Sequence, residues 1–506
     1  MTMTLKQLIA RHACYRGELP AVQFEAQRLN WREFNAYCNQ VANAFAAAGL
    51  KKGDKVATVL PNSLELLTLY WAITSLGGVV VPLSPLLNPV GIVKLLKACR
   101  AFSVVVSPAH EQALSASLRE QGIDTHLLVV DDAERENSFS EFIADAPASP
   151  VKASQIEPDD LFNIVYSSGT TGEPKGIEHS HLVRSQYGAH FAAAFRMTPE
   201  SVILHTGSIV FNGAFVILMP AFFLGAKYIL HKAFNVEHML ATIRDEKVTH
   251  AMMVPAQIIA LLEHPGLKAS DLESLEMVLS LGAPLYQQHK DRFNALLPGR
   301  LYELYGLTEG FITVLDKFDM PRKSGSVGTP LPGFEMRIVD DTGNNLPAGE
   351  VGEIVGSGPL TMSGYYQRPD LTAETIRDGW IYTGDLGYID EDGFLFLVDR
   401  KKDMIISGGV NVYPRDIEDV IVNHPDVIET AVFGAKSAQW GEIPVAAITL
   451  RANRKASKAE FIEWINQRVD AKYQRVSDIV ILEEFPRNAA GKTLKTKLRE
   501  DYHANK

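Results

Sequence analysis

Cysteine is scarce in this sequence, and so are long uninterrupted hydrophobic runs. The 506 residues include only three cysteines: Cys14, Cys38 and Cys99. Their odd number and wide spacing exclude a disulfide framework and a CxxC metal site, which favours a reducing compartment. The most apolar stretch, residues 209–226, is interrupted by Asn212, Gly213 and Pro220. We therefore expect a buried core segment there and no membrane span.

Positive charge is also limited. Lysine and arginine number 49 against 60 aspartate and glutamate residues, which gives a formal net charge of −11. Binding to nucleic-acid phosphates needs a concentrated basic surface, so nucleic acid is not expected as a partner. The first twenty residues lack the apolar core of a signal peptide, and the last three match no peroxisomal or retention signal. These absences predict a cytoplasmic location.

The length of the chain predicts more than one domain, because single cores stop growing near about 250–300 residues. Short apolar runs separated by helical lengths fill the first third of the sequence: 55–60, 79–81, 103–106 and 127–130. Strands that are apolar on both faces indicate parallel α/β layers covered by helices. From Gly325 onward the sequence contains short glycine-rich segments typical of β-strands. After Asp403 the pattern indicates α+β structure, with helices expected at 414–424 and 461–469.

The predicted fold class is therefore α/β. We expect a large N-terminal domain with two layered α/β subdomains and a β-rich subdomain, followed by a small α+β C-terminal domain. The boundary is predicted at 399–403, where a charged run interrupts two apolar segments. The resulting limits are 1–399 for the first domain, 400–402 for the connecting segment and 403–506 for the second domain.

The strongest motif is Tyr-Ser-Ser-Gly-Thr-Thr-Gly-Glu-Pro-Lys-Gly at 166–176, directly after the apolar run 161–165. Its glycines allow tight backbone turns, and its hydroxyls and lysine suit anionic oxygens. The spacing is not that of a Walker A loop. A flexible surface loop is the alternative, but ten motif positions filled together disfavour it. A phosphate-binding loop is predicted, with these candidate residues: Ser167, Ser168, Gly169, Thr170, Thr171, Gly172 and Lys175.

Five further motifs follow in order: YGLTE at 305–309, YTGD at 382–385, DRKKD at 399–403, SGGVNVYP at 407–414 and PRNAAGK at 486–492. Each has an ordinary explanation when taken singly, such as a core tyrosine, a Gly-Asp turn, a solvated charge run or a surface lysine. Together with the phosphate loop they span nearly the whole chain. In this order they resemble the adenylate-forming (AMP-binding) superfamily, which includes acyl-CoA synthetases, peptide-synthetase adenylation domains and luciferases.

The resemblance implies a nucleotide site. Tyr305 and Gly306 would lie against adenine, and Thr308 and Glu309 would serve catalysis at the phosphates, with Glu309 as the Mg²⁺ ligand. This is chemically sensible, because an aromatic face stacks on a base and a carboxylate suits a hard cation. Further nucleotide contacts would come from five residues: Gly282, Ala283, Pro284, Asp385 and Arg400. Of these, Asp385 would accept hydrogen bonds from the ribose hydroxyls, and Arg400 would also touch the ribose.

The resemblance also implies a mobile C-terminal domain. Lys402 falls at the family's pivot residue, and Gly408 and Gly409 would line the route of the pantetheine arm of coenzyme A, where the absence of side chains lets a thin substrate pass. Lys492 would be the catalytic lysine that neutralises charge developing between the carboxylate and the α-phosphate.

The acid-binding pocket is predicted to involve six residues besides Tyr305 and Gly306: Phe211, Asn212, Phe215, Ser280, Leu281 and Phe311. None of these eight residues is charged, so an apolar fatty or aryl acid is expected. Many members of the family carry histidine where this chain has Phe211. A ring is retained there, but the polar contact it could make to the carboxylate is lost.

The implied function is an AMP-forming acid–thiol ligase, an acyl-CoA synthetase that uses ATP, Mg²⁺ and coenzyme A. A carrier-protein-loading adenylation enzyme, a luciferase-like oxygenase and an inactive nucleotide-binding sensor share the motifs and stay open as alternatives. The presence of Lys175, Glu309 and Lys492 argues against the sensor. The sequence does not fix the oligomeric state, and a homodimer is compatible with it.

Overall fold

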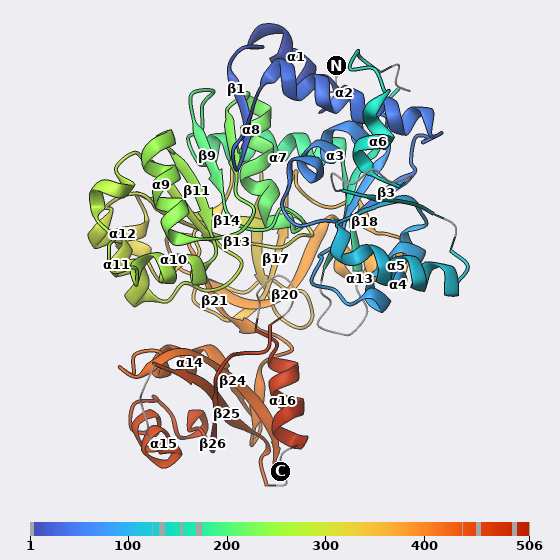
Figure 1. The fold of residues 1–506 in the computed structure, drawn as a ribbon. Coiled ribbons are helices and arrows are strands. Elements are labelled where there is room, and N and C mark those ends of the chain that lie inside the picture. Colours follow the sequence, from blue (N-terminus) through green and yellow to red (C-terminus); the bar gives the residue numbers. More distant parts are fainter. Residues whose placement is uncertain are drawn as a thin grey trace.

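The computed structural model of the chain describes residues 5–123, 125–130, 137–151, 155–167, 175–437, 439–451, 457–487 and 493–504. A large body holds the elements up to β21, and a smaller body at the C-terminal end holds the elements around α14, α15 and α16 (Figure 1). Of the motifs above, residues 168–174 of the phosphate loop and residues 488–492, which include Lys492, lie outside the described residues.

A seven-stranded sheet carries the first predicted strands. Its order is β18 (Gly364–Tyr365), β8 (Lys175–Ser180), β7 (Leu161–Ser167), β4 (Val79–Pro82), β3 (Lys55–Val59), β5 (Ala101–Val106) and β6 (His126–Val129). The strands from β7 to β6 are parallel, as the apolar runs predicted, whereas β8 returns antiparallel to β7. The helices between these strands are α3 (Leu64–Ser75), α4 (Pro89–Cys99), α5 (Pro108–Glu120) and α6 (Phe139–Ala144).

A nine-stranded sheet forms the second α/β layer. Its order is β15 (Thr329–Pro330), β14 (Ile312–Leu315), β13 (Leu301–Gly306), β12 (Met277–Leu281), β11 (His250–Met253), β9 (Val202–His205), β10 (Lys227–Leu230), β1 (Pro20–Phe24) and β2 (Gln27–Asn30). Its α-helices are α1 (Leu8–Tyr15), α2 (Trp31–Ala47), α7 (His181–Ala194), α8 (Phe215–Leu224), α9 (Val236–Glu246), α10 (Pro255–Leu262), α11 (Gln287–Leu296) and α12 (Met320–Lys323). Short 3₁₀ turns are η1 (Leu5–Gln7), η2 (Asn212–Ala214) and η3 (Ala269–Leu272).

The remaining strands form two smaller sheets. The β-rich part comprises β16 (Glu335–Val339), β17 (Gly352–Ser357), β19 (Ile376–Arg377), β20 (Trp380–Ile389), β21 (Leu395–Arg400) and the helix α13 (Pro369–Thr375). The C-terminal sheet comprises β22 (Ile405–Ser407), β23 (Val410–Val412), β24 (Val427–Ser437), β25 (Gly441–Leu450) and β26 (Asp478–Leu482). It is accompanied by α14 (Pro414–Ile421), α15 (Lys458–Asn466), η4 (Lys472–Gln474) and α16 (Lys495–Ala504). The predicted helix at 461–469 is thus too long, because α15 ends at Asn466.

The sequence of helix α8 explains why this helix lies in the core. Helix α8 consists of the residues FVILMPAFFL, and eight of its ten residues are buried. A helix that is apolar on all sides has to lie inside the protein. Helix α8 packs against α7, which starts directly after β8 and brings the acid-pocket segment close to the strands that flank the phosphate loop. The expectation of a buried core segment at 209–226 is confirmed, and no helix in the described part of the chain is long and apolar enough to cross a membrane.

The chain changes from one sheet to another between Arg400, which ends β21, and Ile405, which begins β22. Across this change, the backbone N–H of Arg415 donates to Asp399 Oδ2 at 3.1 Å. Burial raises the pKa of Asp399 to about 6. Nearby, Lys495 pairs with Glu418 at 2.7 Å. The segment predicted to act as a hinge therefore lies beside a charged contact between α14 and β21.

Candidate active site

Three of the predicted nucleotide residues meet in space. The hydroxyl of Tyr305, at the end of β13, donates to Asp385 Oδ2 in β20 at 2.8 Å. On the other side of that carboxylate, Arg400 Nε lies 3.5 Å from Asp385 Oδ1. Burial and the charge of Asp385 raise the pKa of Tyr305 well above its usual value, so its hydroxyl stays protonated and can donate. Strands from two sheets thus bring a ring, a carboxylate and a guanidinium to one place.

Glu309 is held by a residue that the sequence analysis missed. The hydroxyl of Tyr365 donates to Glu309 Oε1 at 2.7 Å, and Lys175 Nζ lies 4.9 Å from the centre of the Tyr365 ring. Burial and the neighbouring carboxylate raise the pKa of Tyr365, so this hydroxyl also remains a donor. Tyr365 lies in β18, which pairs with β8 through Tyr365 and Ile177. The only signal for it in the sequence was a Gly-Tyr-Tyr run without known spacing to the other motifs.

The Tyr365→Phe variant should slow adenylate formation by about tenfold. The substitution removes one hydrogen bond to a charged group, worth about 1.5 kcal/mol, and lets the Glu309 carboxylate rotate. The rate should be measured as a function of Mg²⁺ concentration, where we expect the half-saturating concentration to rise. Tyr366→Phe is the matched control, since that hydroxyl accepts from the exposed Gln367. A variant with wild-type rates across the whole Mg²⁺ range would show that Tyr365 does not position Glu309.

The ends of the predicted phosphate loop are held side by side. Ser167 ends β7 and Lys175 begins β8, and the two residues are partners in the antiparallel register. Ser168, Gly169, Thr170, Thr171 and Gly172 lie outside the described residues, as does the side chain of Ser167. Their assignment to phosphate binding stays a prediction. The same holds for Lys492, which lies outside the described residues between Arg487 and Thr493. Of these two, Arg487 pairs with Glu429 at 2.5 Å.

The predicted acid-pocket residues differ in exposure. Phe211 and Asn212 are half-buried at the start of η2, and residues 282–284 are exposed after β12. The two segments approach each other, because a Cβ added to Gly213 would lie 3.0 Å from Leu281 Cδ1. Phe215, Ser280 and Phe311 are fully buried, so they could form only the floor of a pocket. Phe311 packs edge-on to Tyr305, with 6.4 Å between the ring centres.

A charged side chain also borders this segment. Arg184, from α7, donates to Asn212 Oδ1 at 2.9 Å, and its guanidinium lies 4.0 Å from the centre of the Phe215 ring. Arg184 is fully buried. Arg184 was not predicted from the sequence, because α7 contributes it from outside the segments that hold the predicted pocket residues.

The predicted hinge and pantetheine residues lie beside an open pocket of about 790 Å³ in the C-terminal part. Three lysines line it: Lys401, Lys402 and Lys436. Gly408 and Gly409 have φ angles of 59° and 82°, in the left-handed region that favours glycine. The N–H of Gly408 donates to the carbonyl of Trp440 at 2.8 Å, and a Cβ at Gly408 would lie 2.9 Å from the Trp440 ring. The turn is thus shaped by both glycines and by the indole beside them.

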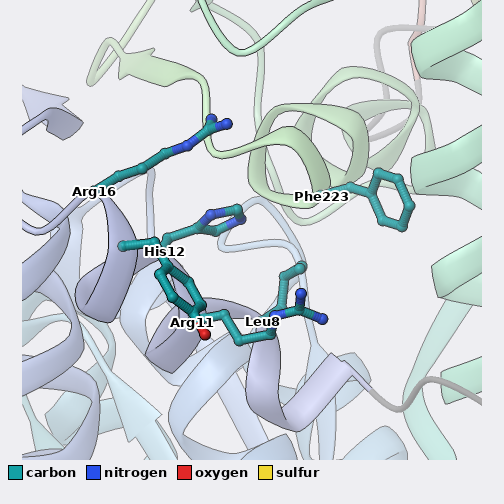
Figure 2. A pocket seen from close by; sticks show the side chains of 6 residues that line it. Leu8, Arg11, His12, Arg16 and Phe223 are labelled. Atoms are coloured by element: carbon teal, nitrogen blue, oxygen red, sulfur yellow. The ribbon is translucent and has the colours of Figure 1, made fainter.

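Another pocket, of about 370 Å³, lies between α1 and α8 and contains none of the predicted residues (Figure 2). Arg16 Nη1 donates to the carbonyl of Leu224 at 3.0 Å, and His12 Nε2 lies 2.9 Å from the carbonyl of Phe222. These side chains attach α1 to the C-terminal end of α8. Their polar atoms are engaged by the fold, so we assign this pocket no part in the chemistry.

Known proteins are similar to this chain over most of its length. The family model described as AMP-binding enzyme matches residues 9–366, and the model described as AMP-binding enzyme C-terminal domain matches residues 416–492. A feruloyl-CoA synthase from Amycolatopsis sp is 32% identical over 504 residues, covering 97% of this chain and 98% of that protein. A long-chain-fatty-acid–CoA ligase from Mycobacterium tuberculosis is 32% identical over 484 residues, covering 94% of each chain. The crystal structure of ATP-bound MatB from Rhodopseudomonas palustris superposes with a TM-score of 0.91 at 30% identity and covers 99% of each chain.

Proposed function

The chain belongs to the AMP-binding enzyme family, and we propose that it joins an apolar fatty or aryl acid to coenzyme A. It is an ATP-dependent, AMP-forming acid–thiol ligase that works through an acyl adenylate. The single observation that carries the proposed site is the meeting of Tyr305, Asp385 and Arg400. An aromatic ring beside a diol-accepting carboxylate and a cation suits an adenosine.

In the first half-reaction the acid's carboxylate attacks the α-phosphate of ATP and pyrophosphate leaves. Both reactants are anionic, so positioning and charge neutralisation control the barrier. Lys175 would hold phosphate oxygens at the end of the loop, and Lys492 would meet the charge that develops between the carboxylate and the α-phosphate. Thr308 lies next to Glu309 and would contact the phosphates from that side.

Magnesium fits the side chains proposed for it. One oxygen of Glu309 accepts from Tyr365, which leaves the second oxygen for a hard cation. Among the described residues no group of three or more histidine, cysteine or acidic side chains could hold a metal ion. This agrees with a cation held by one carboxylate and by substrate phosphates, since Mg²⁺ is commonly bound in this way. When bound, Mg²⁺ would offset phosphate charge.

In the second half-reaction the thiol of coenzyme A attacks the acyl carbonyl and AMP leaves. We propose that rotation about Lys402 replaces Lys492 with the turn formed by Gly408 and Gly409. Lys402 and Lys436 of the neighbouring pocket would attract the phosphates of coenzyme A, whereas Lys401 is paired with Asp341 and Glu353. Because ATP and coenzyme A are cytoplasmic substrates, we also propose a cytoplasmic location, and a homodimer is to be tested by light scattering.

Replacing Phe211 by alanine should raise the KM for the preferred acid by about tenfold and shift the preference toward bulkier acids. Full burial of a phenyl ring is worth about 3–5 kcal/mol, and only part of this is expected at a half-buried position. Phe211→His restores a ring of similar shape and should be tolerated. Steady-state kinetics over a series of small and bulky acids measures both effects. An unchanged acid profile in the alanine variant would remove Phe211 from the pocket.

The test of the proposed function is product analysis with ATP, coenzyme A and a panel of fatty and aryl acids. We expect acyl-CoA, AMP and pyrophosphate in equal amounts with at least one acid. Adenylate formation without thioester would indicate a carrier protein as the acceptor, and oxygen consumption with light emission would indicate an oxygenase. Nucleotide binding without any turnover across the panel would support an inactive sensor and contradict the proposal.

A further inference from the structure

Arg184 is a cation in the protein interior that has no carboxylate partner among the described residues. Its side chain is fully buried, and no ion pair involving it is present in the described part of the chain. Burial lowers its pKa only to about 10, so the guanidinium is charged at neutral pH. A buried charge without a counter-ion is costly unless other groups or a ligand compensate it. This is unlike Lys290, another buried cation, which is paired with Glu303.

The groups around Arg184 are neutral. Nε donates to Asn163 Oδ1 at 3.0 Å and Nη2 donates to Asn212 Oδ1 at 2.9 Å, while Tyr187 and Phe215 present ring faces to the guanidinium. Asn163 belongs to β7, before the phosphate loop, and Asn212 belongs to the acid-pocket segment. Arg184 therefore bridges the strand that leads into the phosphate loop and the segment predicted to hold the acid.

A histidine extends this bridge to the YGLTE motif. Arg184 Nη2 lies 3.2 Å from His179 Nδ1, and His179 Nε2 lies 2.9 Å from the carbonyl oxygen of Thr308. A carbonyl can only accept and a guanidinium can only donate, so His179 is neutral and carries its proton on Nε2. Burial and the charge of Arg184 lower the pKa of His179 well below its usual value, which agrees with this state. His179 thus adds no negative charge to balance Arg184.

The cluster has donors in excess. Arg184 Nη1 and Asn163 Nδ2 are both buried and have no hydrogen-bond partner among the described residues. Both are N–H donors, so the missing partner is an acceptor. Asn212 is fixed on two sides, because Oδ1 accepts from Arg184 and Nδ2 donates to the hydroxyl of Tyr187 at 3.1 Å. Its neighbour Phe211 has no polar side-chain atom.

We infer that Arg184 is the positioning residue for the carboxylate of the acid substrate and acts on it through Asn212. The inference rests on the proposed function, which places that carboxylate beside Phe211 and Asn212. The anionic substrate supplies the negative charge that the described residues do not provide. In return, the fixed cation favours a carboxylate over an uncharged group of the same shape, at a place where Phe211 can offer only shape.

The test compares a charged ligand with its uncharged counterpart. For the best acid of the panel, KM is measured together with the inhibition constant of the primary alcohol that has CH₂OH in place of the carboxylate. The variants are Arg184→Met, Arg184→Lys and Asn212→Leu. Arg196→Met is the matched control, because Arg196 pairs with Asp316 at 2.7 Å outside this cluster. Thermal unfolding of each variant shows whether it is folded.

Arg184→Met should raise the KM for the acid at least tenfold and change the inhibition constant of the alcohol less than twofold. The KM of Arg184→Lys for the acid should lie between those of Arg184→Met and the wild type, because lysine keeps the positive charge and lacks the planar guanidinium. Asn212→Leu should also raise the KM for the acid more than the inhibition constant of the alcohol. If Arg184→Met does not fold, this variant tests the inference in its place. Equal weakening of acid and alcohol, or no weakening, would overturn the inference. If the wild type forms no acyl-CoA, the proposed function fails first, independently of these variants.

Discussion

The Lys492→Ala variant should form acyl adenylate about 10²–10³-fold more slowly than the wild type. Lys492 is the only residue proposed to place a positive charge between the attacking carboxylate and the α-phosphate. Loss of one such preorganised partner costs about 3–4 kcal/mol in the transition state. Thioester formation from supplied acyl-AMP should be nearly unchanged, because the lysine is proposed to leave the site before the thiol arrives.

The two half-reactions of this variant can be measured separately. Acid-dependent pyrophosphate release in a single turnover reports the first, and acyl-CoA formation from synthetic acyl-AMP reports the second. Lys497→Ala is a suitable control, since Lys497 pairs with Asp501 at 2.7 Å on the exposed side of α16. If both half-reactions fell by the same factor, one fixed conformation would serve both steps and the two-state account would be wrong.

The Lys402→Pro variant should show the opposite pattern. Proline fixes φ near −65°, so a pivot residue that has to take two backbone conformations is held in one. The N–H groups of Lys401 and Asp403 donate to the carbonyls of Gly384 and Arg400, and proline at 402 removes neither of these donors. We expect first-turnover pyrophosphate release within a few-fold of the wild type and a loss of acyl-CoA output of about 10²-fold or more.

Lys402→Ala separates the backbone effect from the side-chain effect. It keeps the conformational freedom of the residue and removes one of the three lysines at the pocket, so only the KM for coenzyme A should rise. The same pair of single-turnover assays applies. If Lys402→Pro slowed both half-reactions equally, Lys402 would not be the pivot, and another residue of the segment 399–403 would have to serve.

Continuous apolar runs were a reliable guide to the fold because a strand buried on both faces has little freedom in composition. Strands β3 to β6 follow those runs closely. The end of α15 was harder to predict. Val469 continues the apolar spacing and packs on the C-terminal core, although the helix ends at Asn466. Spacing reports burial, and burial continues past Asn466, the last residue of the helix.

Sequence patterns also did not predict which residues of the candidate site contact one another. The motifs named Tyr305 and Asp385 separately, but their hydrogen bond joins residues 80 positions apart, and only the fold brings them together. Tyr365 and Arg184 belong to no motif used in the sequence analysis. They act on Glu309 and Asn212 from neighbouring elements, so their importance depends on contacts that a linear pattern does not contain.

We expect the acid to be activated as an acyl adenylate before it reaches coenzyme A. The most direct measurement uses an acid labelled with ¹⁸O in both carboxylate oxygens, with ATP and coenzyme A, and follows the label by mass spectrometry. The carboxylate oxygen that bonds to the α-phosphorus stays with AMP when the thiol breaks the acyl–oxygen bond. We therefore expect one ¹⁸O atom in each AMP released and none in pyrophosphate. Unlabelled AMP, or ADP with labelled phosphate, would contradict it.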